Sequence, residues 1–396
     1  MAFLDRKIKF QYENGELMIG HMSVSQAIAI VGHLPCYVYS RSMISERINY
    51  FRSLMPSALK LHYAIKANPS PSVVHFIAKQ VDGLDVASHK ELRLALETQV
   101  PPKNISMAGP GKSDNDLRAA VAAGVTLNVE SANEVDRIYQ IAELLSVREV
   151  NLALRINPNF KVKGIGMAMG GRATQFGIDE DCLAAAIKRV HNPADIKSLH
   201  IFSGSQNLNS GALGVIFQKT FETAERMIKK HGLTISRINI GGGLGIPYFE
   251  KDQDLDLGFV ASVLHQELEK WHKKYPGCMV EMELGRFLVG EAGAYLCQVV
   301  DKKKSREKTF LVTNGGLHHH LAATGNFGQV IRKNYPIAIA TKMGEEPTDT
   351  YDIVGPLCTP IDTFATNIAL PTAEIGDVIA IFSRELTAIR PAHTIF

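Results

Sequence analysis

Apolar and polar positions follow one repeating pattern from residue 36 to about residue 290. Short apolar runs rich in β-forming residues recur, and segments with helical spacing of apolar residues lie between them. The predicted strands lie near 61–66, 84–87, 105–108, 126–130, 150–156, 198–203, 236–240 and 278–283. The predicted helices lie near 72–80, 90–98, 114–123, 133–145, 183–190, 214–231 and 259–274. Eight strands alternating with helices over about 250 residues favour an α/β fold, a (β/α)8 TIM barrel, over a doubly wound open sheet.

The pattern changes after about residue 290. Strands predicted at 294–300, 309–313, 351–354 and 377–382 are separated by loops, without a long amphipathic helix. The N-terminal part predicts short strands, helices over 23–31 and 41–54, and a strand at 36–39. We therefore expect a barrel over 36–290 and a C-terminal β-domain over 291–396 that also takes in residues 1–35.

The composition is that of an ordinary globular enzyme, with 45% hydrophobic and 21% charged residues. A formal net charge of +3 gives no case for nucleic-acid binding, and we interpret the basic run at 302–308 as a solvated loop between two strands. No apolar run is long enough to span a bilayer, and the N-terminus lacks the apolar core of a signal peptide. Five scattered cysteines without CxxC spacing favour a reducing compartment, so we expect a cytoplasmic protein without membrane attachment.

Polar residues and glycines follow every predicted barrel strand, at the end where a TIM barrel carries its active site. The first strand ends at Lys66, in the run His-Tyr-Ala-Ile-Lys-Ala-Asn at 62–68. Partial desolvation would lower the pKa of this amine and make it nucleophilic, as a Schiff base with a carbonyl cofactor such as pyridoxal phosphate (PLP) requires. The alternative is a solvated lysine that caps a strand.

Two further strand ends fit the same cofactor. The three glycines at 241–243 follow the seventh strand and would let backbone N–H groups approach a phosphate, although a tight turn alone would also use them. Glu283 in the eighth strand could keep the cofactor's ring nitrogen protonated, and Arg286 could clamp the phosphate. The alternative for Glu283 is a surface carboxylate.

Seven motifs, in the same order along the chain, resemble those of the PLP-dependent ornithine/diaminopimelate decarboxylases, which are built on the alanine-racemase-like barrel (group IV, fold type III). The motifs are Tyr-Ala-Ile-Lys-Ala-Asn at 63–68, Asp-Val-Ala-Ser at 85–88, Gly-Pro-Gly-Lys at 109–112, Gly-Ser-Gln at 204–206, Gly-Gly-Gly at 241–243, Glu-Leu-Gly-Arg at 283–286 and Gly-Pro-Leu-Cys at 355–358. The resemblance implies a carboxy-lyase that removes CO2 from the α-carbon of an amino acid. It also implies a homodimer whose two subunits share each active site.

The resemblance further implies a role for each matched residue. Lys66 holds PLP as a Schiff base, Glu283 contacts the pyridine nitrogen, and Cys358 from the second subunit is the acid that protonates the carbanion left by CO2 loss. The remaining implied cofactor-binding residues are Asp85 beside the lysine, Arg155 near the phenolic oxygen, and Ser205, Gly241, Gly242, Gly243 and Arg286 at the phosphate. Many members of the family stack a histidine on the ring where this chain has Phe202, whose aromatic face can also stack.

Thr359 follows the cysteine, where diaminopimelate and ornithine decarboxylases carry a carboxylate for the distal amine of the substrate. A hydroxyl cannot pair with an ammonium in the same way, so free ornithine, lysine or diaminopimelate fits poorly. The stretches at 315–320 and 355–360 resemble a subgroup, including exosortase-associated relatives, that acts on aminoacyl groups such as glutamyl thioesters on an acyl-carrier protein. Thr359 and His319 are the candidate substrate contacts. Because neighbours in a β-segment face opposite ways, the histidines at 318–320 do not predict a metal site.

The family has a Gly-Ala-Tyr turn after the strand that ends here at Phe382, and this chain has Ser-Arg-Glu-Leu-Thr at 383–387 instead. We expect a truncated β-domain and weaker PLP binding. Three other functions stay open: decarboxylation of free diaminopimelate or another free amino acid, racemisation on the same barrel, and a catalytically impaired binding protein.

Overall fold

The computed structural model describes residues 9–162, 164, 166–249, 251–326, 332–382 and 394–395. The chain divides into two compact units. One, the barrel unit, contains Ile48–Gly245 and Asp254–Gly285. The other, the β-unit, contains Met1–Arg47, Ile246–Gln253 and Arg286–Phe396.

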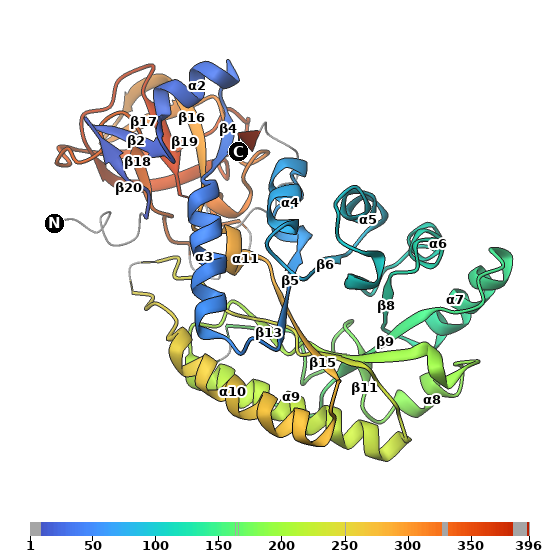
Figure 1. The fold of residues 1–396 in the computed structure, drawn as a ribbon. Helices are drawn as coiled ribbons and strands as arrows, with labels where there is room; N and C mark the ends of the chain where they lie inside the picture. The colour runs from blue at the N-terminus through green and yellow to red at the C-terminus, as the bar shows by residue number, and fades with distance from the viewer. Residues whose placement is uncertain are drawn as a thin grey trace. The chain divides into compact units, whose positions relative to one another are not determined.

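Eight parallel strands close on themselves in the barrel unit (Figure 1). They are β5 (Leu59–Ala64), β6 (Gly83–Val86), β7 (Ile105–Met107), β8 (Thr126–Val129), β9 (Asn151–Asn157), β12 (Ile196–Ile201), β14 (Arg237–Asn239) and β15 (Met279–Leu284). Each pairs in parallel with the next, and β15 pairs with β5 to close the ring. All four residues of β6 and of β8 are buried, as expected for parallel strands covered on both faces. The predicted (β/α)8 barrel is confirmed.

Helices connect the strands, and serine caps start several of them. The helices are α3 (Arg41–Leu54), α4 (Pro71–Ala78), α5 (His89–Leu96), α6 (Asp114–Ala123), α7 (Ala132–Leu144), α8 (Leu183–Ile187), α9 (Ser210–His231) and α10 (Leu257–Lys274). The side chains of Ser88, Ser113 and Ser131 each accept a hydrogen bond from a backbone N–H in the first turn of the following helix. These caps fix where α5, α6 and α7 begin, within a few residues of strand ends that carry candidate site residues.

The β-unit is built around one long strand, β16 (Gly293–Ser305). Its sheet also contains β4 (Cys36–Tyr39), β17 (Lys308–Thr313), β18 (Ile337–Ile339), β19 (Asp349–Val354), β20 (Thr363–Leu370), β21 (Val378–Ile381) and β22 (Thr394–Ile395). A three-stranded sheet, β1 (Tyr12–Glu13), β2 (Glu16–Ile19) and β3 (Met22–Ser23), leads into α2 (Val24–Val31). Leu17, Val24, Val38 and Leu296 belong to one buried core cluster, so N-terminal residues complete this unit. The short helix α11 (Arg286–Val289) precedes β16.

Three features differ from the sequence-based expectations. Strand β4 lies within the range assigned to the barrel but pairs with β16 of the β-unit, because burial alone does not reveal a strand's partner. The basic run is not a loop: its first residues lie in β16 and Lys308 begins β17, with only a tight turn between them. The histidines at 318–320 lie in a turn and not in a β-segment. The altered turn at 383–387 falls outside the described residues.

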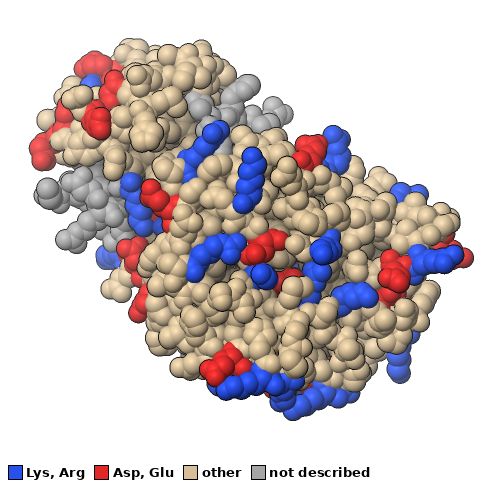
Figure 2. Space-filling model, in the orientation of Figure 1, with Lys and Arg blue, Asp and Glu red and all other residues tan. Residues whose placement is uncertain are grey.

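Charged side chains of both signs are interspersed over the face shown in Figure 2. Within the described part of the chain, none of the helices has the length and apolar character needed to cross a bilayer. In the same part, no group of three or more His, Cys, Asp or Glu side chains has the arrangement of a metal site.

Candidate functional site

Lys66 lies just beyond the barrel strand that the sequence assigned to it. Strand β5 ends at Ala64, and Lys66 sits in a single 3-10 turn, Ile65–Ala67. Its Nζ is 3.7 Å from Oδ2 of Asp85 on the neighbouring strand β6, and its side chain is 61% exposed. The turn therefore carries Lys66 out of the strand, and most of its side chain is exposed in the single chain.

Glu283 is held at the end of β15 by an amide that the sequence analysis missed. Asn239 donates from Nδ2 to Oε1 of Glu283 at 2.5 Å, and its Oδ1 accepts from the N–H of Gly241 at 2.9 Å. The N–H of Glu283 in turn donates to the carbonyl of Gly241 at 2.8 Å. Asn239 is 3% exposed, and its position between Ile238 and Ile240 at the end of a predicted strand was the only signal for it in the sequence. These contacts bring the predicted carboxylate and the predicted glycine turn together.

Two buried carboxylates, those of Glu283 and Asp85, have pKa values that are shifted in opposite directions. Burial disfavours ionisation of Glu283, but His200, whose Nε2 is 3.5 Å from Oε2, together with Lys66 holds the pKa of Glu283 well below its usual range. Burial, and then the charge of Glu283, raise the pKa of Asp85 above its usual range, against the opposing effect of Lys66. One carboxylate therefore stays ionised, while its neighbour is the better proton holder.

The glycine turn after β14 leaves no room for side chains at Gly242 and Gly243. A Cβ at Gly242 would lie 2.0 Å from the carbonyl oxygen of Glu283, and one at Gly243 would lie 2.5 Å from that of Gly204. Gly241 and Gly243 also have φ values of +69° and +92°. Among the described residues, the N–H groups of Gly242 and Gly243 have no hydrogen-bond acceptor. Successive free N–H groups in a turn of this kind form an anion-binding nest.

The loop after β12 packs on this turn. The N–H of Asn207 donates to the carbonyl of Gly243 at 2.9 Å, which places Ser205, two residues earlier, beside the glycines. Phe202 is partly buried, and a Cβ at Gly241 would lie 2.5 Å from its ring. Both predicted cofactor residues of this loop therefore lie next to the nest.

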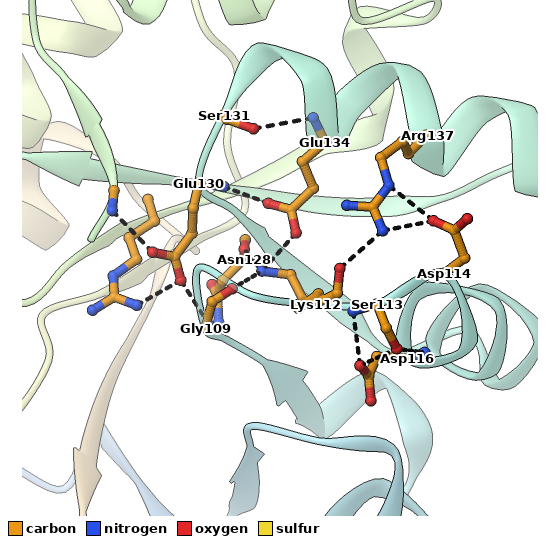
Figure 3. A network of polar contacts seen from close by, with 12 residues as sticks. Gly109, Lys112, Ser113, Asp114, Asp116, Asn128, Glu130, Ser131, Glu134 and Arg137 are labelled. Atoms are coloured by element: carbon orange, nitrogen blue, oxygen red, sulfur yellow. Dashed lines mark hydrogen bonds and ion pairs between the residues drawn. The ribbon is translucent and has the colours of Figure 1, made fainter. Parts of the chain in front are cut away.

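Glu130 joins three neighbouring strand ends (Figure 3). Its Oε1 accepts from the N–H of Gly109 and from Nη1 of Arg155, each at 2.7 Å, and its Oε2 accepts from the N–H of Gly177 at 2.9 Å. The guanidinium of Arg155 also lies 5.1 Å from the ring centroid of Phe176. Arg155 thus has a fixed orientation, and its charge contributes to the environment of Asp85.

Lys112, from the Gly-Pro-Gly-Lys motif, is not available to a ligand. Its side chain is fully buried, and its Nζ contacts the carbonyl oxygens of Gly109 (2.6 Å) and Asn128 (2.9 Å) and Oε1 of Glu134 (2.8 Å). The other carboxylate oxygen of Glu134 accepts from the N–H of Glu130 at 2.7 Å (Figure 3). The motif therefore helps to hold the backbone of Glu130 in place, because Lys112 binds the carboxylate of Glu134 that accepts its N–H.

The predicted residues Cys358, Thr359 and His319 belong to the β-unit. Cys358 and its neighbours lie in an exposed loop, and Asp362, which the sequence analysis missed, fixes that loop. The carboxylate of Asp362 accepts from the N–H groups of Leu357 (2.8 Å) and Leu317 (2.5 Å), and so joins this loop to the histidine turn. No sequence signal identified Asp362, because an Asp two residues after a Pro is ordinary in a loop.

His319 and Arg286, which also belongs to the β-unit, have defined contacts. His319 accepts a hydrogen bond from the hydroxyl of Tyr37 at its carbonyl oxygen, 2.8 Å away. Burial, and then the neighbouring His318, lower the pKa of its ring, so His319 is neutral at pH 7. Arg286 begins α11, and its guanidinium lies 5.7 Å from the ring centroid of Tyr248.

The barrel residues fit a phosphorylated pyridine aldehyde. They provide an amine at Lys66, an ionised carboxylate at Glu283 for a protonated ring nitrogen, and free N–H groups at Gly242 and Gly243 for a phosphate. The strand ends that carry them are neighbours in the closed sheet, β14–β15–β5.

The comparisons with known proteins agree with this fit. The chain is 30% identical to the L-glutamyl-[BtrI acyl-carrier protein] decarboxylase of Niallia circulans, over 88% of this chain and 83% of the relative. It is also 30% identical to the diaminopimelate decarboxylase of Aquifex aeolicus, over 94% and 86%. The structure of diaminopimelate decarboxylase from M. jannaschii in co-complex with L-lysine superimposes with a TM-score of 0.83 at 26% identity, over 98% of this chain and 90% of that one. The model of the family described as "Pyridoxal-dependent decarboxylase, pyridoxal binding domain" matches residues 41–290, and the chain belongs to this family of PLP-dependent carboxy-lyases.

Proposed function

We propose that this protein removes CO2 from the α-carbon of an aminoacyl group carried by an acyl-carrier protein, with a glutamyl thioester as the leading candidate. The proposal rests on Thr359, which stands where diaminopimelate and ornithine decarboxylases carry a carboxylate, with the neutral His319 as the second proposed substrate contact. The nearby carboxylate of Asp362 is buried and bonded to the N–H groups of Leu317 and Leu357. A free diamino acid would bring an ammonium without a counter-charge. A glutamyl group joined through its side-chain carboxyl presents a neutral thioester there instead. The relative that acts on a glutamyl carrier protein supports this assignment.

In this proposal the barrel residues bind and orient the cofactor. Lys66 holds it covalently, Glu283 keeps a proton on its ring nitrogen, and the N–H groups of Gly242 and Gly243 bind its phosphate. The other proposed cofactor contacts are Asp85, Arg155, Phe202, Ser205, Gly241 and Arg286. When bound, PLP supplies an electron sink for the pair released with CO2.

Cys358 is the proposed acid that returns a proton to the α-carbon after CO2 leaves. Its loop is exposed, and Leu357 and Ile361 beside it are 37% and 50% exposed in the single chain. Apolar side chains around an exposed thiol fit a surface that a second copy covers. We therefore propose a homodimer in which Cys358 serves the partner's barrel. All five cysteines are free thiols, which fits the proposed cytoplasmic location.

The test compares substrates on the purified, PLP-loaded protein. A glutamyl carrier-protein thioester is assayed beside free glutamate, diaminopimelate, ornithine and lysine, with CO2 release and the mass loss of the product as readouts. We expect turnover of the thioester, and no turnover by Lys66→Ala, which also loses the absorbance of bound cofactor. Turnover of diaminopimelate alone would replace the carrier function with a free amino-acid decarboxylase. Exchange of the α-proton without CO2 release would indicate a racemase, and a lack of PLP binding would indicate a binding protein.

A further inference from the structure

A groove lies beneath the Cys358 loop, entirely within the β-unit. Its floor is one face of the strands β16, β17 and β19, where Lys303 is paired with Phe310 and Val312 with Val354. Leu357 is among the loop residues that cover it, and the groove has a volume of about 470 Å³. This volume lies within the usual range for small-molecule sites, roughly 300–1,000 Å³.

The loop over the groove is held in place. The N–H of Gly355 donates to the carbonyl of Asp362 at 2.9 Å, and the carboxylate of Asp362 accepts from Leu357 as described above. A Cβ at Gly355 or at Gly316 would lie within about 2.5 Å of that carboxylate, so both positions require glycine. A preformed groove loses little conformational entropy when it takes up a ligand.

The groove and the proposed catalytic thiol lie on the same loop. Leu357 and Thr359 line the groove, whereas Cys358 between them does not. A group bound in the groove would therefore contact Thr359, which is also the proposed neighbour of the neutral end of the substrate.

A lysine without an acidic partner stands at the groove. Lys302 is bound by the carbonyl of Ala373 and Lys308 by Asp352, but Lys303, which lines the groove, has no acidic partner among the described residues. The groove combines apolar residues with Ser305, Thr359 and Thr363, and its one carboxylate, that of Asp362, is already bonded to the N–H groups of Leu317 and Leu357. A mixed lining with one ammonium that lacks an acidic partner fits a flexible thioester arm that carries amides and a phosphodiester.

We propose that this groove binds the phosphopantetheine arm of the acyl carrier, with Phe310, Val312 and Leu357 contacting the arm and Lys303 binding its phosphate. The inference rests on the proposed function, since only a carrier-linked substrate has such an arm. The basic run is then part of the substrate site and not merely a solvated surface.

The experiment compares Lys303→Glu with Lys304→Glu in the full-length protein loaded with PLP. Lys304 is the matched control, because it pairs with Thr309 and does not line the groove. Each protein is assayed with the glutamyl carrier-protein thioester and with the glutamyl N-acetylcysteamine thioester, which lacks the phosphate. We expect Lys303→Glu to lower the ratio of kcat/KM for the carrier substrate over the short thioester about tenfold, through KM, while Lys304→Glu retains the wild-type ratio.

Equal ratios for the two variants, with an active wild-type protein on the carrier substrate, would refute the groove assignment and leave the proposed function standing. A wild-type protein that acts on free amino acids but on neither thioester would refute both the groove assignment and the proposed carrier-linked function. Size-exclusion chromatography tests whether a second copy of the chain occupies the groove instead. If Lys303→Glu dissociates the dimer and Lys304→Glu does not, a second copy fills the groove and the assignment is wrong.

Discussion

The buried pair of Lys112 and Glu134 offers a quantitative test of how the barrel supports its site. Lys112→Met removes an ammonium that has three oxygen partners at 2.6–2.9 Å and a fully buried side chain. The side chain of Glu134 is only 7% exposed, so its carboxylate remains buried without a cation. Breaking a buried ion pair from one side costs about 3–5 kcal/mol. For a unit of this size, that loss corresponds to a decrease of roughly 6–20 °C in Tm.

The double variant Lys112→Met/Glu134→Gln separates the lost charge pair from the lost packing. The amide that Glu134→Gln introduces is not charged, yet its carbonyl oxygen still accepts the N–H of Glu130, so most of the cost of Lys112→Met is expected to disappear. The pH dependence gives a second readout. Burial already raises the pKa of Glu134 and Lys112 opposes that rise, so without Lys112 the carboxyl takes up a proton more readily. Relative to the double variant, the single variant then loses stability as the pH rises above the ordinary pKa of a glutamate, because the raised pKa of Glu134 must be overcome to ionise a buried carboxyl.

The assay is urea and thermal unfolding of the cofactor-free protein, followed by circular dichroism, for wild type, both single variants and the double variant. A loss below about 1 kcal/mol for Lys112→Met would refute the reasoning, because it is the level of an exposed pair. A double variant as unstable as Lys112→Met would also refute it, since packing and not charge would then be responsible.

Three further changes test the site. Glu130→Gln removes the carboxylate that orients Arg155, and we expect about tenfold weaker PLP binding in an absorbance titration. Asp85→Asn removes a carboxyl whose pKa burial and Glu283 raise to about 8, a contribution to stability that is complete below about pH 4 and is lost as the pH rises through 8. Thermal unfolding across this range should show the wild type losing stability relative to Asp85→Asn. Gly242→Ala places a Cβ 2.0 Å from a backbone oxygen, and we expect loss of PLP binding or of folding, measured by titration and circular dichroism.

Matched controls make these outcomes decisive. Asp136→Asn removes the partner of Arg189 at an exposed ion pair and should leave PLP affinity unchanged. Gly211→Ala, at a helical position where a Cβ has ordinary contacts, should bind PLP as the wild type does. If Glu130→Gln binds PLP as tightly as Asp136→Asn does, the orientation of Arg155 is not needed for the cofactor. A constant stability difference across the pH range would contradict the raised pKa of Asp85.

The repeating pattern of strands and helices was enough to predict the barrel, because each buried parallel strand is a local apolar run and each helix has its own periodicity. The pairing of β4 with β16 was not predictable in the same way, since it joins segments more than 250 residues apart and all four residues of β4 are buried. Strand β20 was missed because Thr366 and Asn367 interrupt its apolar residues in the sequence, although the strand continues through Asn367 at a positive φ.

At the site, the sequence identified the residues that follow each strand. It did not show which of them are accessible to a ligand and which are buried in supporting contacts. Lys112 and Lys66 both follow a strand, and only the structure shows that one is fully buried in an ion pair and the other is open. His200 and Asn239 were visible in their strands, yet their contacts with Glu283 depend on the registers of β12, β14 and β15. Side-chain direction at the end of a closed sheet is a property of that register and not of local composition.

Asn239 has a consequence for how the site can change. One amide contacts both the carboxylate proposed for the ring nitrogen and the turn proposed for the phosphate. Together with the backbone hydrogen bond from Glu283 to Gly241, this side chain sets the spacing between the two. A version of this enzyme adapted to a longer or shorter cofactor would have to alter residue 239 as well as the backbone contact between β15 and the glycine turn.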